Sequence, residues 1–325
     1  MSALNYRAPA WLPGGHAQTI WPLLIKGPLP PYRRERWETP DGDFIDLDWI
    51  DGIPGAPCLA LFHGLEGSSR SHYARRLMRA AGKQGWHGVV IHFRGCSGEP
   101  NRLARAYHSG DSAEIDWILR RLHAAAYPAL FAAGVSLGGN ALLKWAAELG
   151  DNPRSPADAI AAVSVPLDLA AANDALSAGF NLVYARHFLR TLIPAAQAKD
   201  RRFPGRFDLR RALVARTLRD FDDAVTAPLH GFAGADDYYA RSSAGPLLGT
   251  IRLPTLLLHA INDPFLPPAA LPRPEYLPPA VKLELLDQGG HVGFVHGLPP
   301  GRVDWMPERV VAHFVEHLPD TRRMR

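Results

Sequence analysis

The chain has 325 residues, of which 47% are hydrophobic and 21% are charged, a balance typical of a globular protein. This length is enough for a large core, or for one domain with an insertion. The formal net charge is only +4, and the arginines are scattered rather than gathered in a stripe with aromatic residues. This pattern argues against nucleic-acid binding.

Two cysteines, Cys58 and Cys96, are too few for a disulfide framework. We expect Cys58 in the core and Cys96 as a free thiol in a loop, which fits a reducing, cytoplasmic location. The N-terminus has no charged segment followed by an apolar run, so we expect no signal peptide. We also expect no integral membrane span, because no run approaches ~18 apolar residues.

In chain order, residues 1–40 come first and are rich in proline and tryptophan, without clear periodicity. We expect them to form an arm packed on the domain. From residue 41 onward, apolar runs alternate with segments of helical periodicity. The predicted strands are 44–50, 58–64, 88–95, 130–134, 159–169, 255–263 and 281–291, and the predicted helices include 71–84, 113–125 and 310–318.

The central strands predict the fold class. CLALFHG (58–64), for example, is apolar at consecutive positions, as a strand buried on both faces is. Such strands alternating with helices predict an α/β protein with a mostly parallel central sheet flanked by helices. Ligands bind beyond the carboxyl ends of such sheets. The polar residues at or just after predicted strand ends are His63, Arg94, Ser136 and Asp263.

No sheet strand is apparent between Asp168 and Ile251, whereas ordinary connections take about two to six residues. Helical patterns fill this stretch instead. We therefore expect a helical cap at 168–251, inserted between two parts of the core at 41–167 and 252–325. The alternative is a second independent domain, but the stretch is short for one and the sheet resumes after it.

The segment GVSLGG (134–139) places Ser136 between two glycines where a predicted strand meets a helix. A tight turn alone would explain the glycines. The sharper hypothesis is a nucleophile elbow, which lifts the serine hydroxyl above the sheet edge. A serine needs a base to take its proton, and that base needs an orienting acid. We therefore look for both partners later in the chain.

Asp263 and His291 each follow a later predicted strand, in the order acid then histidine that the elbow requires. A proline after Asp263 would hold the carboxylate on a rigid turn. A glycine pair before His291 frees the backbone to bring the imidazole across. Ser136, Asp263 and His291 are therefore the predicted triad. Asp168 and His296 are the alternative acid and base.

Acyl transfer by a serine also needs donors for the developing oxyanion. The elbow supplies the N–H of Leu137, and the loop after an earlier strand, HGLEGSS (63–69), supplies the N–H of Leu65. His63 and Glu66 of this loop are candidates for the substrate pocket. For Glu66 the expected partner is a loop N–H or an arginine, with a catalytic role as a further alternative.

The chain shows no HExxH or CxxC spacing, no GxGxxG after the first strand and no phosphate-binding loop. We therefore expect no metal and no cofactor.

These features together resemble the YheT-like branch of the α/β-hydrolases. The resemblance runs from residue 9 to the last histidine motif and implies a capped α/β-hydrolase fold. By position it implies a charge-relay triad of Ser136, Asp263 and His291. The resembling blocks are HGLEGSSRSHYARRL (63–77), HFRGCSGEPNRLARAYHSGD (92–111), GVSLGGNALLKW (134–145), FDDAVTAPLHGFAGADDYYARSSA (221–244), INDPF (261–265) and GGHVGF (289–294).

The resemblance also implies a carboxylic-ester hydrolase. From the triad we expect an acyl-enzyme, formed on a small-molecule ester with a short- to medium-chain or lipid-like acyl group. Tyr238 and Tyr239 lie in one of its blocks, where they either pack the cap or line an acyl pocket. The alternatives are an acyltransferase or lipid acyl hydrolase with the same triad, or a non-catalytic binding protein on this fold. The sequence does not indicate the oligomeric state.

Overall fold

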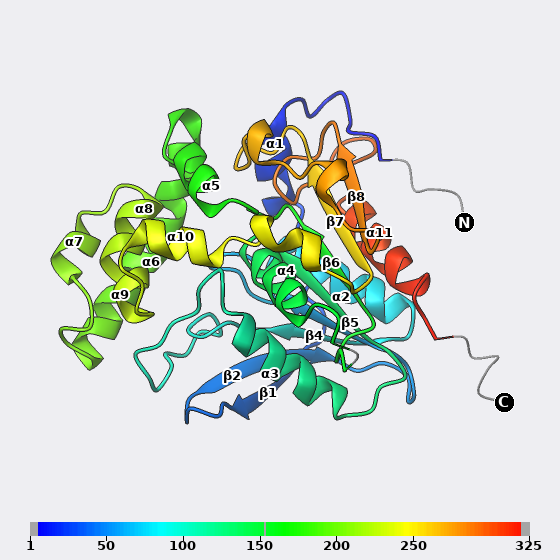
Figure 1. Ribbon diagram of the computed structural model, residues 1–325. Coiled ribbons are helices and arrows are strands. Elements are labelled where there is room, and N and C mark those ends of the chain that lie inside the picture. Colours follow the sequence, from blue (N-terminus) through cyan, green and yellow to red (C-terminus); the bar gives the residue numbers. More distant parts are fainter. Residues whose placement is uncertain (1–5, 153, 320–325) are drawn as a thin grey trace.

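The computed structural model describes residues 6–152 and 154–319. Residues 1–5 of the expected arm and residues 320–325 of the expected core lie outside the described residues. Within them, eight strands form one sheet in the order β1-β2-β4-β3-β5-β6-β7-β8 (Figure 1). The strands are β1 (Arg33–Glu38), β2 (Phe44–Ile50), β3 (Cys58–Phe62), β4 (His87–Ile91), β5 (Leu130–Val135), β6 (Ala159–Val163), β7 (Thr255–Ala260) and β8 (Val281–Leu286).

Six neighbouring strands run parallel, namely β4, β3, β5, β6, β7 and β8. At one edge of the sheet, β2 pairs antiparallel with β4, and β1 pairs antiparallel with β2. All seven predicted strands are confirmed, although several end earlier than expected. Strand β1 was missed, and the expectation that the whole of residues 1–40 forms an arm is therefore wrong. Its six residues pair with β2 and belong to the sheet.

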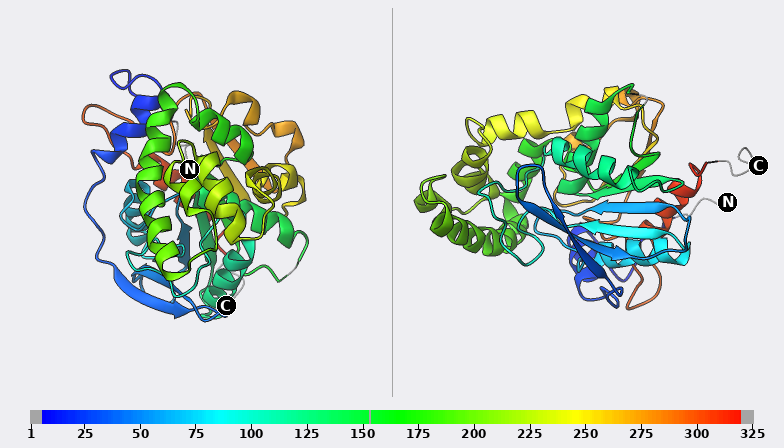
Figure 2. Two further views of the ribbon diagram at one scale, coloured as in Figure 1. Left: turned by 90° about the vertical axis from the view of Figure 1, so that its left-hand side faces the viewer. Right: turned by 90° about the horizontal axis from the view of Figure 1, so that it is seen from below.

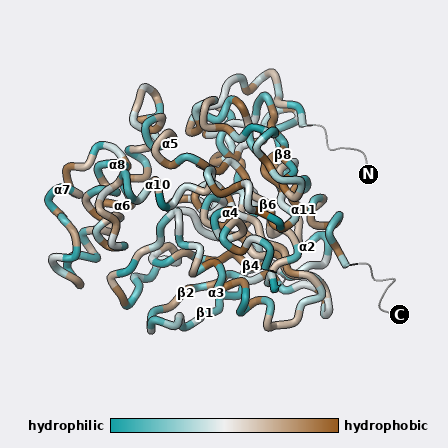
Figure 3. The backbone as a smooth tube through the Cα atoms, in the orientation of Figure 1, coloured by the Kyte–Doolittle hydropathy of each residue, from teal (hydrophilic) through white to brown (hydrophobic). Residues whose placement is uncertain are grey.

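Alternate residues of each strand point to opposite faces, so the sheet has two cores. On one face, Cys58 and Ala60 of β3 pack with helices α3 (Ser112–His123) and α4 (Leu137–Leu149). On the other, the intervening strand residues pack with α2 (His72–Lys83) and α11 (Trp305–Val315). Figure 2 shows these helices on both sides of the sheet, and Figure 3 shows hydrophobic colours gathering in the middle of the molecule.

Residues 169–242 form a group of helices at one end of the molecule, which we call the helical cap (Figure 1). It has its own apolar cluster, which Phe265 and Leu266 of the core join. The division into cap and core at residues 167 and 252 stays a prediction. The elements of the cap are α5 (Leu169–Leu176), η2 (Gly179–Asn181), α6 (Leu182–Arg202), α7 (Leu209–Leu213), α8 (Leu218–Phe221), the π-helix η3 (Asp222–Thr226), α9 (Ala227–Leu229) and α10 (Ala235–Ser242).

The N-terminal segment carries helix α1 (Gly15–Ile20), followed by the 3₁₀ turn η1 (Trp21–Leu23). Two indole N–H groups tie this segment to the loop after β8. Trp11 Nε1 donates to the carbonyl of Gly297 at 2.9 Å, and Trp21 Nε1 donates to that of Pro300 at 2.7 Å. The remaining 3₁₀ turns are η4 (Gly245–Thr250), η5 (Pro268–Ala270) and η6 (Pro274–Tyr276).

Arg94, just after β4, is the centre of a buried ionic cluster. Its Nε donates to Glu114 Oε1 at 2.7 Å, and its Nη1 donates to Asp41 at 2.9 Å and to Asp43 at 3.2 Å. The side chains of Arg94, Asp43 and Glu114 are all buried. Removing the cation would leave two buried carboxylates without their counter-charge, which is far more costly than loss of a surface pair.

We therefore expect Arg94→Met to lower the free energy of unfolding by about 3–5 kcal/mol, measured by urea denaturation. The matched control is Arg120→Met on α3, whose exposed pair with Asp116 spans one helical turn at 2.7 Å. That variant should change the free energy of unfolding by less than about 1 kcal/mol. Equal effects of the two substitutions would contradict a special role for the buried cluster.

Candidate active site

The turn between β5 and α4 is built around Ser136. This residue has φ 52° and ψ −121°, a conformation that costs energy for a residue with a side chain. The flanking glycines allow close backbone packing. A Cβ added at Gly138 would lie 2.4 Å from the carbonyl oxygens of Phe62 and His63, and one at Gly134 would lie 2.6 Å from Gly138 O. The strand–serine–helix geometry is that of a nucleophile elbow.

Ser136, His291 and Asp263 form one hydrogen-bonded chain. His291 Nε2 lies 3.1 Å from Ser136 Oγ, and His291 Nδ1 lies 2.8 Å from Asp263 Oδ2. The Asp263 side chain is fully buried, and its Oδ1 accepts a hydrogen bond from the Phe265 N–H at 2.9 Å. Because a carboxylate only accepts, Nδ1 carries the proton and Nε2 is free to accept from the serine hydroxyl.

The two alternative residues lie elsewhere. Asp168 is exposed and caps α5, where it accepts a hydrogen bond from the Ala171 N–H at 3.0 Å. His296 Nε2 instead lies 2.5 Å from Asp304 Oδ1. Neither is hydrogen-bonded to Ser136 or His291 among the contacts between described residues.

The loop after β3 brings a second backbone donor to the elbow. A Cβ added at Gly64 would lie 3.3 Å from Ser136 Cβ, which shows how closely this loop approaches the serine. The next residue, Leu65, lines the same cavity as Ser136, and no described residue accepts a hydrogen bond from its N–H. Leu137 is the first residue of α4, where helix N–H groups have no intrahelical acceptor. Both N–H groups are therefore available to a ligand beside Ser136.

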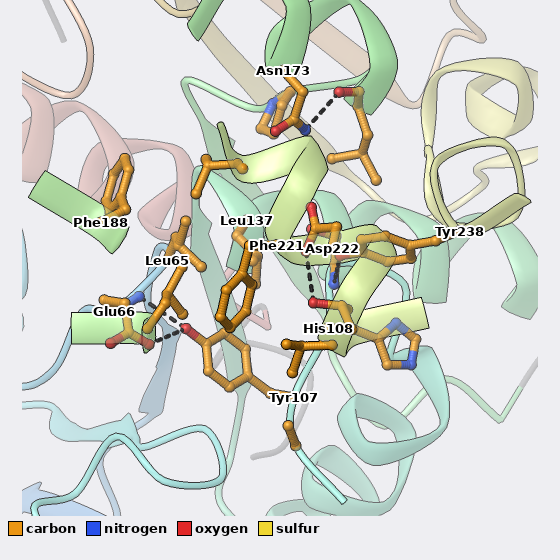
Figure 4. Close-up of a pocket in the computed structure, with 18 of the residues that line it drawn as sticks. Leu65, Glu66, Tyr107, His108, Leu137, Asn173, Phe188, Phe221, Asp222 and Tyr238 are labelled. Carbon is orange, nitrogen blue, oxygen red and sulfur yellow. Dashed lines mark hydrogen bonds between the residues drawn. The ribbon is translucent and has the colours of Figure 1, made fainter. Parts of the chain in front are cut away.

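A cavity of about 200 Å³ lies between the helical cap and the end of the sheet (Figure 4). Ser136 and His291 form part of its wall, so a bound molecule reaches the triad. Most of the remaining wall is apolar and comes from the cap. The large apolar side chains from the cap are Leu169, Leu176, Phe188, Leu192, Leu218, Phe221, Val225 and Leu229.

Three of the four residues expected at the pocket line this cavity, and His63 does not appear among the described residues of its wall. His63 is fully buried, donates from Nδ1 to the Gly64 carbonyl at 2.8 Å and accepts at Nε2 from the Phe93 N–H at 3.2 Å. Burial lowers the pKa of His63 to about 3, so the imidazole is neutral. The expectation for His63 is wrong, because both ring nitrogens are hydrogen-bonded to the backbone, at Gly64 and at Phe93, and the ring does not face the cavity.

Glu66 lies in the cavity wall, but its partner is neither a loop N–H nor an arginine. Its Oε1 accepts a hydrogen bond from the Tyr107 hydroxyl at 2.9 Å, and the same hydroxyl accepts from the Glu66 N–H at 2.9 Å (Figure 4). Tyr238 and Tyr239 both pack in the cap and line the cavity. The Tyr238 hydroxyl accepts a hydrogen bond from the Ser109 N–H at 3.0 Å, and the Tyr239 hydroxyl donates one to Asp222 at 2.8 Å.

Asp222, for which we made no prediction, lies in the π-helix of the cap and faces the cavity (Figure 4). Its carboxylate accepts hydrogen bonds from the hydroxyls of Thr226 at 2.6 Å and Tyr239 at 2.8 Å. Burial raises the pKa of Asp222 from 3.8 to about 6, while these two bonds and the charge of Arg219 lower it. The signal that could have indicated Asp222 is its place on the apolar face of a helical pattern, together with Leu218, Phe221 and Val225.

The folded protein therefore holds a proton on Asp222 at a pH where the unfolded chain has released it. Stability should fall as pH rises from about 4 to 6 and level off above that. Asp222→Asn removes the titration, so between pH 4 and pH 7 the wild type should lose about 2 kcal/mol of unfolding free energy relative to the variant. Urea denaturation of both proteins across this range measures the difference. A pH-independent difference would contradict the raised pKa.

Gln18 and Thr19 of α1 were also missed. They hydrogen-bond to the loops that carry Asp263 and His291. No local pattern marks them, because their partners lie more than 240 residues away in the sequence.

Comparison with known proteins agrees with this geometry. Residues 57–298 match the family model for the alpha/beta hydrolase fold. The chain is 44% identical over 303 residues to the candidate esterase YheT of Escherichia coli (strain K12), covering 91% of this chain and 88% of that one. It belongs to the α/β-hydrolase family, in its YheT-like branch.

Two further relatives extend the comparison. Phospholipase ABHD3 of Homo sapiens is 30% identical over 325 residues, covering 96% of this chain and 78% of that one. The structure of an esterase from Pyrococcus furiosus, PF2001, shares the fold with a TM-score of 0.57 at 15% identity, covering 89% of this chain and 92% of that one. Membership of this family supports hydrolase activity. No helix among the described residues is both long and apolar enough to cross a membrane.

Proposed function

We propose that the protein is a serine hydrolase that cleaves carboxylic esters through an acyl-enzyme. The observation that carries this proposal is the hydrogen-bonded chain from Ser136 through His291 to Asp263, which opens into the cavity. A serine aligned with an imidazole and a buried carboxylate has the parts that acyl transfer requires.

In the proposed reaction, Ser136 Oγ attacks the ester carbonyl and His291 Nε2 takes its proton. The oxyanion accepts hydrogen bonds from the N–H groups of Leu65 and Leu137. His291 then protonates the leaving alcohol, and a water activated by the same nitrogen releases the acid. Asp263 holds the imidazole in the required tautomer and stabilises its charged form. Each hydrogen bond donated to the oxyanion should stabilise the transition state by about 3–4 kcal/mol, by analogy with measured cases.

The apolar wall of the cavity supports an acyl chain as the bound group, either a short- to medium-chain acyl group or a lipid-like one. An apolar chain buried there leaves water at about 25 cal/mol per Å² of surface. The two cysteines are free thiols, which supports a reducing compartment. A cytoplasmic location therefore stays part of the proposal.

A panel of p-nitrophenyl esters of graded chain length, together with labelling by a fluorophosphonate probe, tests this function. We expect labelling at Ser136 and turnover that depends on chain length. Product analysis with added alcohol separates hydrolysis from acyl transfer, and phospholipid substrates test a lipid acyl hydrolase. If the probe does not label the protein and no ester is turned over, the result would favour a non-catalytic binding protein.

A further inference from the structure

We propose that helix α1 is part of the catalytic apparatus, and that Gln18 and Thr19 are positioning residues for His291 and Asp263. This inference rests on the proposed function of the triad. Helix α1 is remote in sequence from all three triad residues, yet it contacts two of the three loops that carry them. The contacts are through backbone, through one buried amide and through one hydroxyl.

The backbone of α1 lies against both loops without side chains between them. A Cβ added at Gly15 would lie 1.9 Å from the carbonyl oxygen of Asn262. One added at Gly290 would lie 2.7 Å from Gly15 O, and one at Gly293 would lie 2.1 Å from Gln18 O. The helix therefore fills the space between the loop after β7 and the loop after β8.

The fully buried amide of Gln18 links the two loops. Its Oε1 accepts from Asn262 Nδ2 at 3.0 Å and from the Gly289 N–H at 2.9 Å. Its Nε2 donates to Leu12 O at 3.0 Å and to Gln288 Oε1 at 2.8 Å. All four hydrogen-bonding positions of the amide are used.

Asn262 extends this link. Its Oδ1 accepts a hydrogen bond from the Gly290 N–H at 3.0 Å, so the residue before Asp263 is bonded to the residue before His291. The separation between the carboxylate and the imidazole is therefore set by Gln18 and Asn262 as well as by the sheet.

Thr19 holds His291 itself. Its Oγ1 accepts from the His291 N–H at 2.8 Å and donates to Gly15 O at 2.7 Å. The backbone around His291 needs such support, because Gly290 and Val292 both have φ 60°. For Val292 this conformation is strained and persists only when its surroundings hold it.

Thr19→Val keeps the shape of the side chain and removes the acceptor for the His291 N–H. We expect kcat for a p-nitrophenyl ester to fall roughly 10- to 100-fold, because small misplacements of a catalytic group have effects of this size. KM should change less than threefold, since neither residue 18 nor 19 lies among the described residues of the cavity wall. Thr19→Ser keeps the hydroxyl and should restore most of kcat. Gln18→Leu should lower kcat to a similar extent.

Two further readouts separate positioning from general destabilisation. The proton NMR signal of the His291 Nδ1–H should shift or broaden in Thr19→Val, and the pH dependence of kcat/KM should shift with it. The matched control is Trp21→Phe, which removes the bond from the same segment to Pro300 without touching residues 262–263 or 289–291. It should lower stability but leave kcat and the NMR signal unchanged.

A folded Thr19→Val variant with wild-type kcat, pH profile and NMR signal would overturn the inference. So would an equal loss of kcat in Trp21→Phe. If Thr19→Val does not fold, Asn262→Ser, which breaks the link from Gln18 to Gly290, decides by the same measurements. Absence of turnover and of fluorophosphonate labelling in the wild type would instead count against the proposed function itself.

Discussion

Ser136→Ala is expected to lower kcat for ester hydrolysis by at least about 10⁴-fold, because the substitution removes the only atom that forms the acyl-enzyme in the proposed reaction. The fold should be kept, since alanine and serine face the same backbone cost at φ 52°. Ester binding should also remain, because the cavity wall is otherwise unchanged. Stopped-flow and steady-state assays of the purified variant, with fluorophosphonate labelling, measure the effect.

The control for this variant is Ser112→Ala at the start of α3, because the Ser112 hydroxyl donates to Glu148 and Ser112 is not among the described residues of the cavity wall. Its turnover and labelling should match those of the wild type. A Ser136→Ala protein that still turns over esters at more than a hundredth of the wild-type rate would place the nucleophile elsewhere.

Asp263→Asn is expected to lower kcat by about 10⁴-fold while leaving the fold intact. The reason lies in the second oxygen of the carboxylate. Asp263 Oδ1 accepts from the Phe265 N–H, so the carbonyl oxygen of an asparagine would stay at that position. Its NH₂ group would then face His291 Nδ1 and donate to it. The imidazole would carry its proton on Nε2 and could no longer accept one from Ser136.

Steady-state kinetics and the NMR signal of the His291 ring N–H test this expectation. Asp168→Asn is the matched control, because Asp168 is the other acid that the sequence offers and asparagine also caps helices well. It should change kcat less than twofold. A larger loss of kcat in Asp168→Asn than in Asp263→Asn would reverse the assignment of the acid.

The sequence could predict the sheet and the three aligned side chains because each depends on local signals. Apolar runs mark strands β3 to β7, and the glycines around Ser136 mark a turn. Strand β1 carries no such signal, since its sequence RRERWE is mostly charged. It is stable because Arg34 and Arg36 lie opposite Asp48 and Asp46, with bonds of 2.7 Å to each, and this pairing is apparent only once the register is known.

The pocket was harder to predict, because its contacts too become apparent only once the fold is known. The tyrosine partner of Glu66 and the inward position of His63 depend on contacts between loops that no spacing rule connects. Gln18 and Thr19 are the extreme case, because an amide and a hydroxyl in a proline-rich segment look like surface residues until the two distant loops are in place.

The position of helix α1 has a consequence for biosynthesis. This helix is translated well before residues 262 and 289–293, whose backbone it docks against. A growing polypeptide on the ribosome therefore lacks the complete docking site of α1 until residue 293 has been synthesised. The imidazole can acquire its final orientation only after residues 289–293 have been synthesised and α1 has docked against them.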